Sequence, residues 1–129
     1  MKTPDFILID DDKIMLFLIE LEIKKHFKNC ISLSFTKADD AVRYIQENKS
    51  ELTHSIILLD LNMPVMNGFQ VLEILNLNST ELKVIIVTSS ISEDDKAKTM
   101  GYSFVLDYMN KPIKGLDLQS LLMSNMNCT

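Results

Sequence analysis

The stretch Phe6-Ile7-Leu8-Ile9-Asp10-Asp11-Asp12 is an unbroken apolar run that ends on three carboxylates. Two later runs have the same form: Ile56-Ile57-Leu58-Leu59 ends at Asp60, and Val84-Ile85-Ile86-Val87 ends at Thr88. Short Val, Ile and Leu runs without polar alternation are typical of parallel strands that are buried on both faces. Because ligands of such sheets bind outside the carboxyl ends of the strands, these polar side chains are predicted to meet at one edge.

Amphipathic patterns separate these runs, and one more short segment, Tyr108-Met109-Asn110-Lys111-Pro112, closes the series. Strands that alternate with helices predict a doubly wound α/β fold with a parallel sheet. In the helix before the last strand, Ser92 is a suitable N-cap residue. The apolar spacing predicts that this helix continues past Gly101 to Phe104.

The composition is that of an ordinary globular protein. The 129 residues, 47% hydrophobic and 24% charged, are enough for a single domain spanning 1–129. Without a membrane-length apolar stretch or a signal peptide, we expect a cytoplasmic protein with no membrane partner. The net charge of −5 argues against direct nucleic-acid binding. Cys30 and Cys128 lack metal-binding spacing and are expected to be unpaired thiols in a reducing cytosol.

The carboxylates at the ends of the first and third runs predict a metal site. Two carboxylates about 4 Å apart repel by about 4 kcal/mol at an effective dielectric near 20, and a hard divalent cation such as Mg²⁺ removes that cost. By themselves, Asp10-Asp11-Asp12 could equally form a turn and a helix N-cap. Asp60 has no such alternative, because the next helix is expected to begin near Gly68, too far away to be capped.

A hydroxyl and an ammonium complete the predicted site. Thr88 suits a strand, but its place at the strand end favours a hydroxyl aimed at a bound anion. Lys111 could be a surface lysine, but Pro112 fixes the backbone beside it, which suits a side chain that must reach a phosphate. Together these residues predict a metal-and-phosphate site.

Over essentially its whole length the chain resembles the receiver domains of two-component response regulators. The resemblance rests on Asp10-Asp11, the stretch 60–68, Thr88 and Lys111-Pro112, in that order and at these spacings. It implies a flavodoxin-like fold with a five-stranded parallel sheet in the order 2-1-3-4-5 and helices on both faces. The switch point between strands one and three would then bring Asp10-Asp11 beside Asp60.

The resemblance also implies the chemistry. Asp60 would be the phospho-acceptor, taking a phosphoryl group from a phosphohistidine on a sensor histidine kinase or a phosphotransfer protein. Asp11, Asp60 and the backbone carbonyl of Asn62 would bind Mg²⁺ directly, and Asp10 would act mostly through water. Such a domain is not a classical enzyme, because it catalyses only its own phosphorylation and autodephosphorylation.

The remaining roles concern the phosphoryl group and the output. Thr88 would donate a hydrogen bond to one phosphoryl oxygen and Lys111 would pair with another, with the bond to Pro112 in the cis form. Tyr108 matches the aromatic switch position of the family, and with Thr88 it would reshape an output surface for a downstream protein. With no second domain expected in the sequence, a stand-alone receiver would signal through that partner.

One departure concerns the interval from Gly101 to Lys111, which is longer than the commonest family pattern. This predicts an extended helix before the fifth strand. Two other interpretations stay open. A phosphatase of the haloacid-dehalogenase type would use Asp10 and Asp12 as nucleophile and acid/base, but it would leave Asp60 unused. A receiver-like docking module that has lost phosphorylation would lack an acidic pair, an acceptor or a lysine, and none is missing.

Overall fold

The computed structural model describes residues 3–78, 81–89 and 91–123. Within them, five parallel strands form one sheet in the order β2-β1-β3-β4-β5, which confirms the predicted topology. The strands are β1 (Phe6–Ile9), β2 (Ser32–Phe35), β3 (Ile56–Asp60), β4 (Lys83–Thr88) and β5 (Val105–Asn110). The helices are α1 (Lys13–His26), α2 (Ala38–Asn48), α3 (Gly68–Asn78), α4 (Glu93–Met100) and α5 (Gly115–Leu122), with a short 3-10 helix, η1 (Lys49–Glu51).

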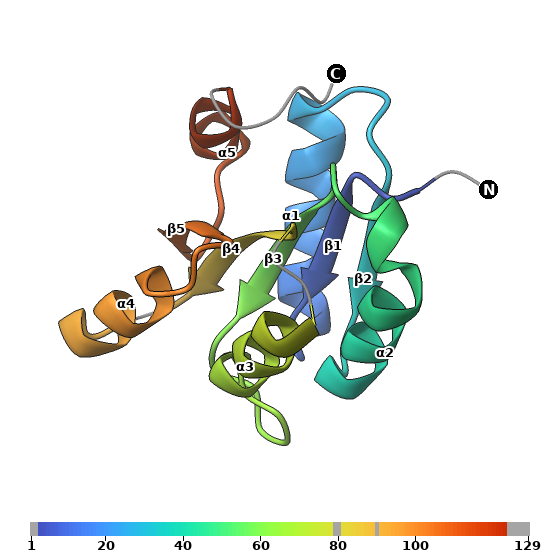
Figure 1. Ribbon diagram of the computed structural model, residues 1–129. Coiled ribbons are helices and arrows are strands. Elements are labelled where there is room, and N and C mark those ends of the chain that lie inside the picture. The colour runs from blue at the N-terminus through green and yellow to red at the C-terminus, as the bar shows by residue number, and fades with distance from the viewer. Residues whose placement is uncertain (1–2, 79–80, 90, 124–129) are drawn as a thin grey trace.

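Helices cover both faces of the sheet (Figure 1). On one face α1 and α5 pack on the strands, and the apolar residues they bury there are called the α1/α5 core. On the other face α2 and α3 bury a second set, the α2/α3 core. The remaining helix, α4, lies beside β5 at the edge of the sheet. The fold is therefore doubly wound, as the alternation of strands and helices predicts.

The central strands are buried because they have neighbours on every side. Phe6, Ile7 and Leu8 of β1 are each 0% exposed, since β1 lies between β2 and β3 and below helices on both faces. This burial explains why β1 and β3 read as continuous apolar runs and do not alternate with polar residues. Because all pairings are parallel, the carboxyl ends of the strands lie along one edge, where Asp10, Asp60 and Thr88 follow or end them.

The interval before Lys111 differs from the expectation of a longer helix. Ser92 does cap α4, accepting a hydrogen bond from Asp95 N–H at 3.1 Å, but α4 ends at Met100 and Gly101 is its C-cap. The prediction that the helix continues to Phe104 is therefore wrong. Phe104 is buried in the α2/α3 core by the turn that follows α4, so its apolar character reflects that core and not a helical stripe.

A β-bulge in β5 accommodates an extra residue. Val105 pairs with Val84, but the next pair is Asp107 with Ile85, so Leu106 is left over. Strand side chains alternate between faces, and residues three apart would normally lie on opposite sides. The bulge reverses that alternation, so Val105 and Tyr108 both pack in the α2/α3 core. Tyr108 is thereby turned toward the sheet face on which the α2/α3 core lies.

Cys30 corrects a second expectation. It is disulfide-bonded, and no cysteine in the described ranges is free, so an unpaired thiol at this position is ruled out. Spacing along a sequence does not reveal proximity in space, which is why the pairing was not anticipated. The other cysteine of the chain, Cys128, lies outside the described residues. Across those same residues, no helix has both the length and the hydrophobicity that a membrane crossing requires.

Candidate functional site

The first part of the site is the turn that joins β1 to α1. Asp10 directly follows β1 and is 2% exposed, and its Oδ1 accepts a hydrogen bond from Asp12 N–H at 2.9 Å. Asp12 in turn caps α1, because its Oδ1 accepts from Ile14 N–H at 2.9 Å and from Met15 N–H at 3.3 Å. These local bonds turn the chain from strand to helix and leave the exposed Asp11 between them, at the edge of the sheet.

The second part is the end of β3 and the loop after it. Asp60 is the last residue of β3 and is 4% exposed, and its Oδ1 accepts a hydrogen bond from Asn62 N–H at 3.2 Å. The loop returns to the strand end through a hydrogen bond from Gly68 N–H to Leu61 O at 3.0 Å. A Cβ at Gly68 would lie 2.7 Å from Leu61 Cα and 2.8 Å from Asp60 O, so the loop can approach only because this residue is glycine.

The third part comes from the ends of β4 and β5. Thr88 is fully buried at the end of β4, and its Oγ1 accepts a hydrogen bond from Asn62 Nδ2 at 3.1 Å. Its backbone carbonyl accepts from Lys111 N–H at 2.9 Å, which fixes the residue after β5 beside the site. The Lys111-Pro112 peptide bond is cis, as the family resemblance implies.

Lys111 links the two buried carboxylates. Its Nζ lies 2.7 Å from Asp10 Oδ2 and 3.5 Å from Asp60 Oδ2, and all three side chains are largely shielded from solvent. The Lys111 ammonium is thus the ion-pair partner of the buried Asp10 Oδ2. This arrangement reduces the repulsion between the carboxylates.

Burial and neighbouring charges both shift the pKa values of Asp60 and Lys111. Burial raises the pKa of the Asp60 carboxyl, although the hydrogen bond from Asn62 N–H lowers it. Among the neighbouring charges, Asp10 raises the pKa of Asp60 and Lys111 lowers it, and the net direction is upward. Burial lowers the pKa of Lys111, but contact with Asp10 and Asp60 outweighs this effect and raises the pKa overall. The lysine therefore stays charged at neutral pH.

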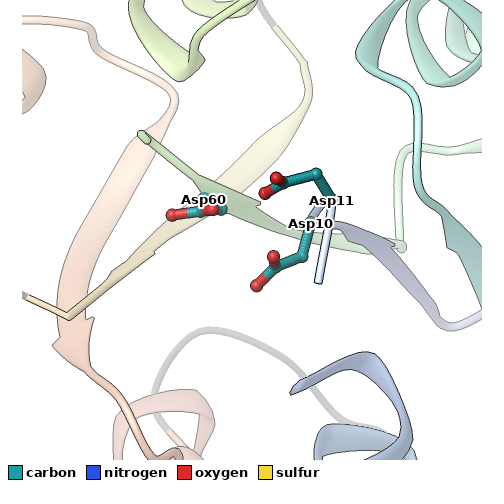
Figure 2. Close-up of side chains that lie close together, drawn as sticks. All are labelled: Asp10, Asp11 and Asp60. Atoms are coloured by element: carbon teal, nitrogen blue, oxygen red, sulfur yellow. The ribbon is translucent and has the colours of Figure 1, made fainter. Parts of the chain in front are cut away.

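Three carboxylates form a group that fits a divalent cation (Figure 2). Oxygen atoms of Asp10, Asp11 and Asp60 lie within 4.8 Å of one another, two residues at the end of β1 and one at the end of β3. Hard oxygen donors of this kind suit Mg²⁺. An open groove lined in part by Asp11, Asn62 and Pro64 gives access from solvent.

Most of the predicted residues meet at this edge, but not all. Asp12 is occupied in capping α1, so it is not paired with Asp10 as the phosphatase interpretation requires. Tyr108 lies outside the group, on β5, beneath the ammonium of Lys96. Two contacts were not anticipated from the sequence: the ion pair between Lys111 and Asp10, and the hydrogen bond that joins Asn62 to Thr88.

Comparison with known proteins agrees with this geometry. Residues 6–123 match the family model described as response regulator receiver domain. Proteins named cell cycle response regulator CtrA, from Brucella ovis and Brucella anthropi, are each 30% identical over 106 residues. The match covers 82% of this chain and 43% of each relative, so the chain spans less than half the length of the curated relatives it matches.

Solved structures show the same fold. The signal receiver domain of a putative LuxO repressor protein from Vibrio parahaemolyticus superimposes with a TM-score of 0.78 at 26% identity, covering 92% of this chain and 86% of that one. A two-component response regulator from Cytophaga hutchinsonii gives the same TM-score and identity, with coverage of 96% and 97%. A response regulator receiver protein from Dyadobacter fermentans, 23% identical, gives 0.81 with coverage of 95% and 97%.

Proposed function

This chain belongs to the response regulator receiver domains of two-component signal transduction, and from this we propose that Asp60 accepts a phosphoryl group from the phosphohistidine of a sensor histidine kinase or a phosphotransfer protein. One observation carries the proposal: Asp60 ends a central strand, buried within a group of three carboxylates and 3.5 Å from the ammonium of Lys111. That surrounding suits a nucleophile toward phosphorus, because charge neutralisation and positioning dominate phosphoryl transfer.

An oxygen of the Asp60 carboxylate attacks phosphorus, the phosphorus–nitrogen bond of the phosphohistidine breaks, and its electron pair stays on the imidazole nitrogen. The product is an acyl phosphate on Asp60. Water later cleaves the phosphorus–oxygen bond to release inorganic phosphate and restore the carboxylate. The chain is thus a signalling domain that catalyses only its own phosphorylation and autodephosphorylation.

A divalent cation belongs to this proposal. Asp11, Asp60 and the backbone carbonyl of Asn62 would hold Mg²⁺ directly, with Asp10 acting through water. When bound, the ion would offset the negative charge that gathers on the transferring group. The clustered carboxylates support this assignment, because their mutual repulsion gives the folded protein no structural benefit without a cation.

Lys111 and Thr88 would hold the transferred group. In the resting protein the Lys111 ammonium pairs with Asp10 and lies 3.5 Å from Asp60 Oδ2, and from there it would reach an oxygen of a phosphoryl group on Asp60. Thr88 ends the neighbouring strand, and its hydroxyl would donate to another phosphoryl oxygen. Fixed donors and cations of this kind stabilise charge where it develops.

An apolar surface on α1, next to the site, fits a protein phosphodonor. Four large side chains of this helix are exposed, and Ile14 and Phe17 are 72% and 58% exposed; the α1 surface comprises Ile14, Phe17, Leu18 and Leu21. It adjoins a groove whose far wall includes Pro112, the residue after Lys111. A contiguous exposed apolar surface is typical of a protein interface, and this one would place a phosphohistidine near Asp60.

The output would pass through Tyr108 to a downstream protein, not to nucleic acid or a membrane. Phosphorylation would draw Thr88 toward the phosphate, and the Tyr108 ring would move inward toward the space that the hydroxyl leaves. The surface around α4, β5 and α5 would then change shape. The acidic net charge of −5 supports a protein partner. We place this exchange in the cytoplasm.

The direct test is phosphorylation by a small donor. The chain is incubated with acetyl phosphate and Mg²⁺, and its intact mass is measured beside that of Asp60→Asn. The matched control is Asp117→Asn, which removes an exposed carboxylate in the first turn of α5. We expect one added phosphoryl group in the unsubstituted chain and the control, and none in Asp60→Asn. Equal labelling of Asp60→Asn would refute the assignment.

A further inference from the structure

Helix α4 is held to the rest of the protein mainly through polar and cationic side chains. Of its eight residues only Thr99 is buried. Lys98 lies over the Phe69 ring of α3, with its Nζ 4.5 Å from the ring centroid. Lys96 lies over the Tyr108 ring of β5 at 4.2 Å. An element with so little buried apolar surface is easily displaced, so the position of α4 depends strongly on each of these contacts.

The contact between Lys96 and Tyr108 depends on the bulge in β5. Leu106 is left over at the bulge, and in a strand without this bulge Tyr108 would lie on the α1/α5 face of the sheet. With it, the tyrosine is half-buried against the α2/α3 core, and its ring lies against the Lys96 ammonium. Contact with Tyr108 raises the pKa of Lys96, so this lysine is a cation at neutral pH.

We propose that Lys96 is a positioning residue that holds the Tyr108 ring in its outward, resting place and thereby sets how readily phosphorylation reshapes the output surface. This inference rests on the proposed function, in which an inward Tyr108 accompanies phosphate at Asp60. The ring cannot move inward and keep its face under the ammonium at the same time. The cation therefore stabilises only the resting arrangement.

The size of the effect follows from linkage. An exposed contact between a cation and an aromatic ring changes an equilibrium about two- to fivefold. Whatever favours the resting state weakens, by the same factor, the binding of any ligand that prefers the other state. Removing the cation should therefore raise the inward population of Tyr108 and tighten the binding of a phosphate mimic at Asp60, each by about two- to fivefold.

The experiment compares two lysines of the same helix. Lys96→Met keeps most of the side-chain stem and removes the charge, Lys96→Arg keeps the charge, and Lys98→Met removes the matching cation over Phe69. Each full chain is labelled with fluorotyrosine, and the Tyr108 fluorine resonance is assigned with Tyr108→Phe. Spectra are recorded first without ligand and then during titration with beryllofluoride and Mg²⁺.

We expect the resting Tyr108 resonance of Lys96→Met to shift toward its beryllofluoride-bound position, with an apparent Kd for the mimic about two- to fivefold lower. Lys96→Arg and Lys98→Met should stay close to the unsubstituted chain. Equal resonance shifts in Lys96→Met and Lys98→Met, or none in either, would overturn the role of Lys96. Failure of the unsubstituted chain to bind the mimic would instead count against the proposed function. In that case the resting spectra still test the contact: a shift in Lys96→Met that is absent from Lys96→Arg and Lys98→Met supports the role of Lys96, and no such difference overturns it.

Discussion

The Lys111 ammonium lies 2.7 Å from a carboxylate oxygen of Asp10, between the ends of two strands that are far apart in the sequence. In the resting protein this lysine therefore compensates charge at the candidate metal site. We propose that it becomes a partner for a phosphoryl group only when a metal cation takes over that task. In this proposal, charge balance at the sheet edge links Lys111, the metal ion and Asp60.

Replacing Lys111 should expose this balance. Lys111→Met leaves two buried carboxylates without their cation, so the free energy of unfolding in a chelator should fall by about 3 kcal/mol. Saturating Mg²⁺ should restore part of that loss. Chemical denaturation with and without Mg²⁺ measures both effects. Lys114→Met, which removes an exposed lysine three residues away, should change stability by less than about 0.5 kcal/mol. Equal losses in the two variants would contradict the account.

The raised pKa of Asp60 predicts a pH dependence with a definite sign. The folded state favours the neutral acid, so without metal its ionisation lowers stability as the pH rises from the ordinary value of 3.8 through the higher folded pKa. Asp60→Asn lacks this loss. Its stability relative to the unsubstituted chain should therefore increase across that interval and become constant above it. Denaturation curves at a series of pH values in a chelator measure the difference, and a decrease would contradict the prediction.

Substitution of Gly68 tests the loop that follows Asp60. Gly68→Ala places a Cβ 2.7 Å from Leu61 Cα, against backbone that cannot yield easily, and should destabilise the protein by about 1–3 kcal/mol. Gly101→Ala is the control, because its Cβ would lie 3.3 Å from Lys98 O and 3.8 Å from Ala97 O, and the residue already has helical torsion angles. That change should cost less than about 1 kcal/mol. Thermal denaturation measures both, and similar losses would refute the role of Gly68.

The α1 surface can be tested separately from the chemistry. Phe17→Ser should slow phosphotransfer from a phosphorylated protein donor about tenfold, because truncating an anchor residue of an interface costs more than about 1 kcal/mol. Its labelling by acetyl phosphate should be unchanged. Leu77→Ser, which removes an 82% exposed side chain from α3 on the other face, is the matched control. A slower reaction with both donors would mean that Phe17 supports the site and not the docking.

The architecture was predictable because the decisive signals are local. The runs before Asp10 and Asp60 are apolar at every position, since β1 and β3 are covered on both faces, and such runs are typical of central parallel strands. Parallel pairing then forces the two aspartates to the same edge. Gly68, seven residues beyond Leu61, closes the intervening loop, and its place at the start of the helix was also visible in the sequence.

Contacts that depend on exact register were not predictable. Apolar residues at positions 105, 106 and 109 fit a regular strand as well as a bulged one, so the bulge at Leu106 leaves no clear sequence signal. Lys96 reads as part of a solvated helix face, because only the reversed alternation of β5 brings Tyr108 beneath it. The pairing of Lys111 with Asp10 likewise follows from two strand ends meeting in space.

The central claim is that Asp60 carries the phosphoryl group, and locating the modified residue tests it most directly. After labelling with acetyl phosphate and Mg²⁺, borohydride reduction converts a phosphorylated aspartate to homoserine, and tryptic peptides are sequenced by tandem mass spectrometry. The tryptic peptide from Ser50 to Lys83 contains Asp60 as its only aspartate. We predict homoserine at position 60, dependent on Mg²⁺. Homoserine at position 10 or 11, or a phosphoryl group on His54 with Asp60 unchanged, would contradict the account.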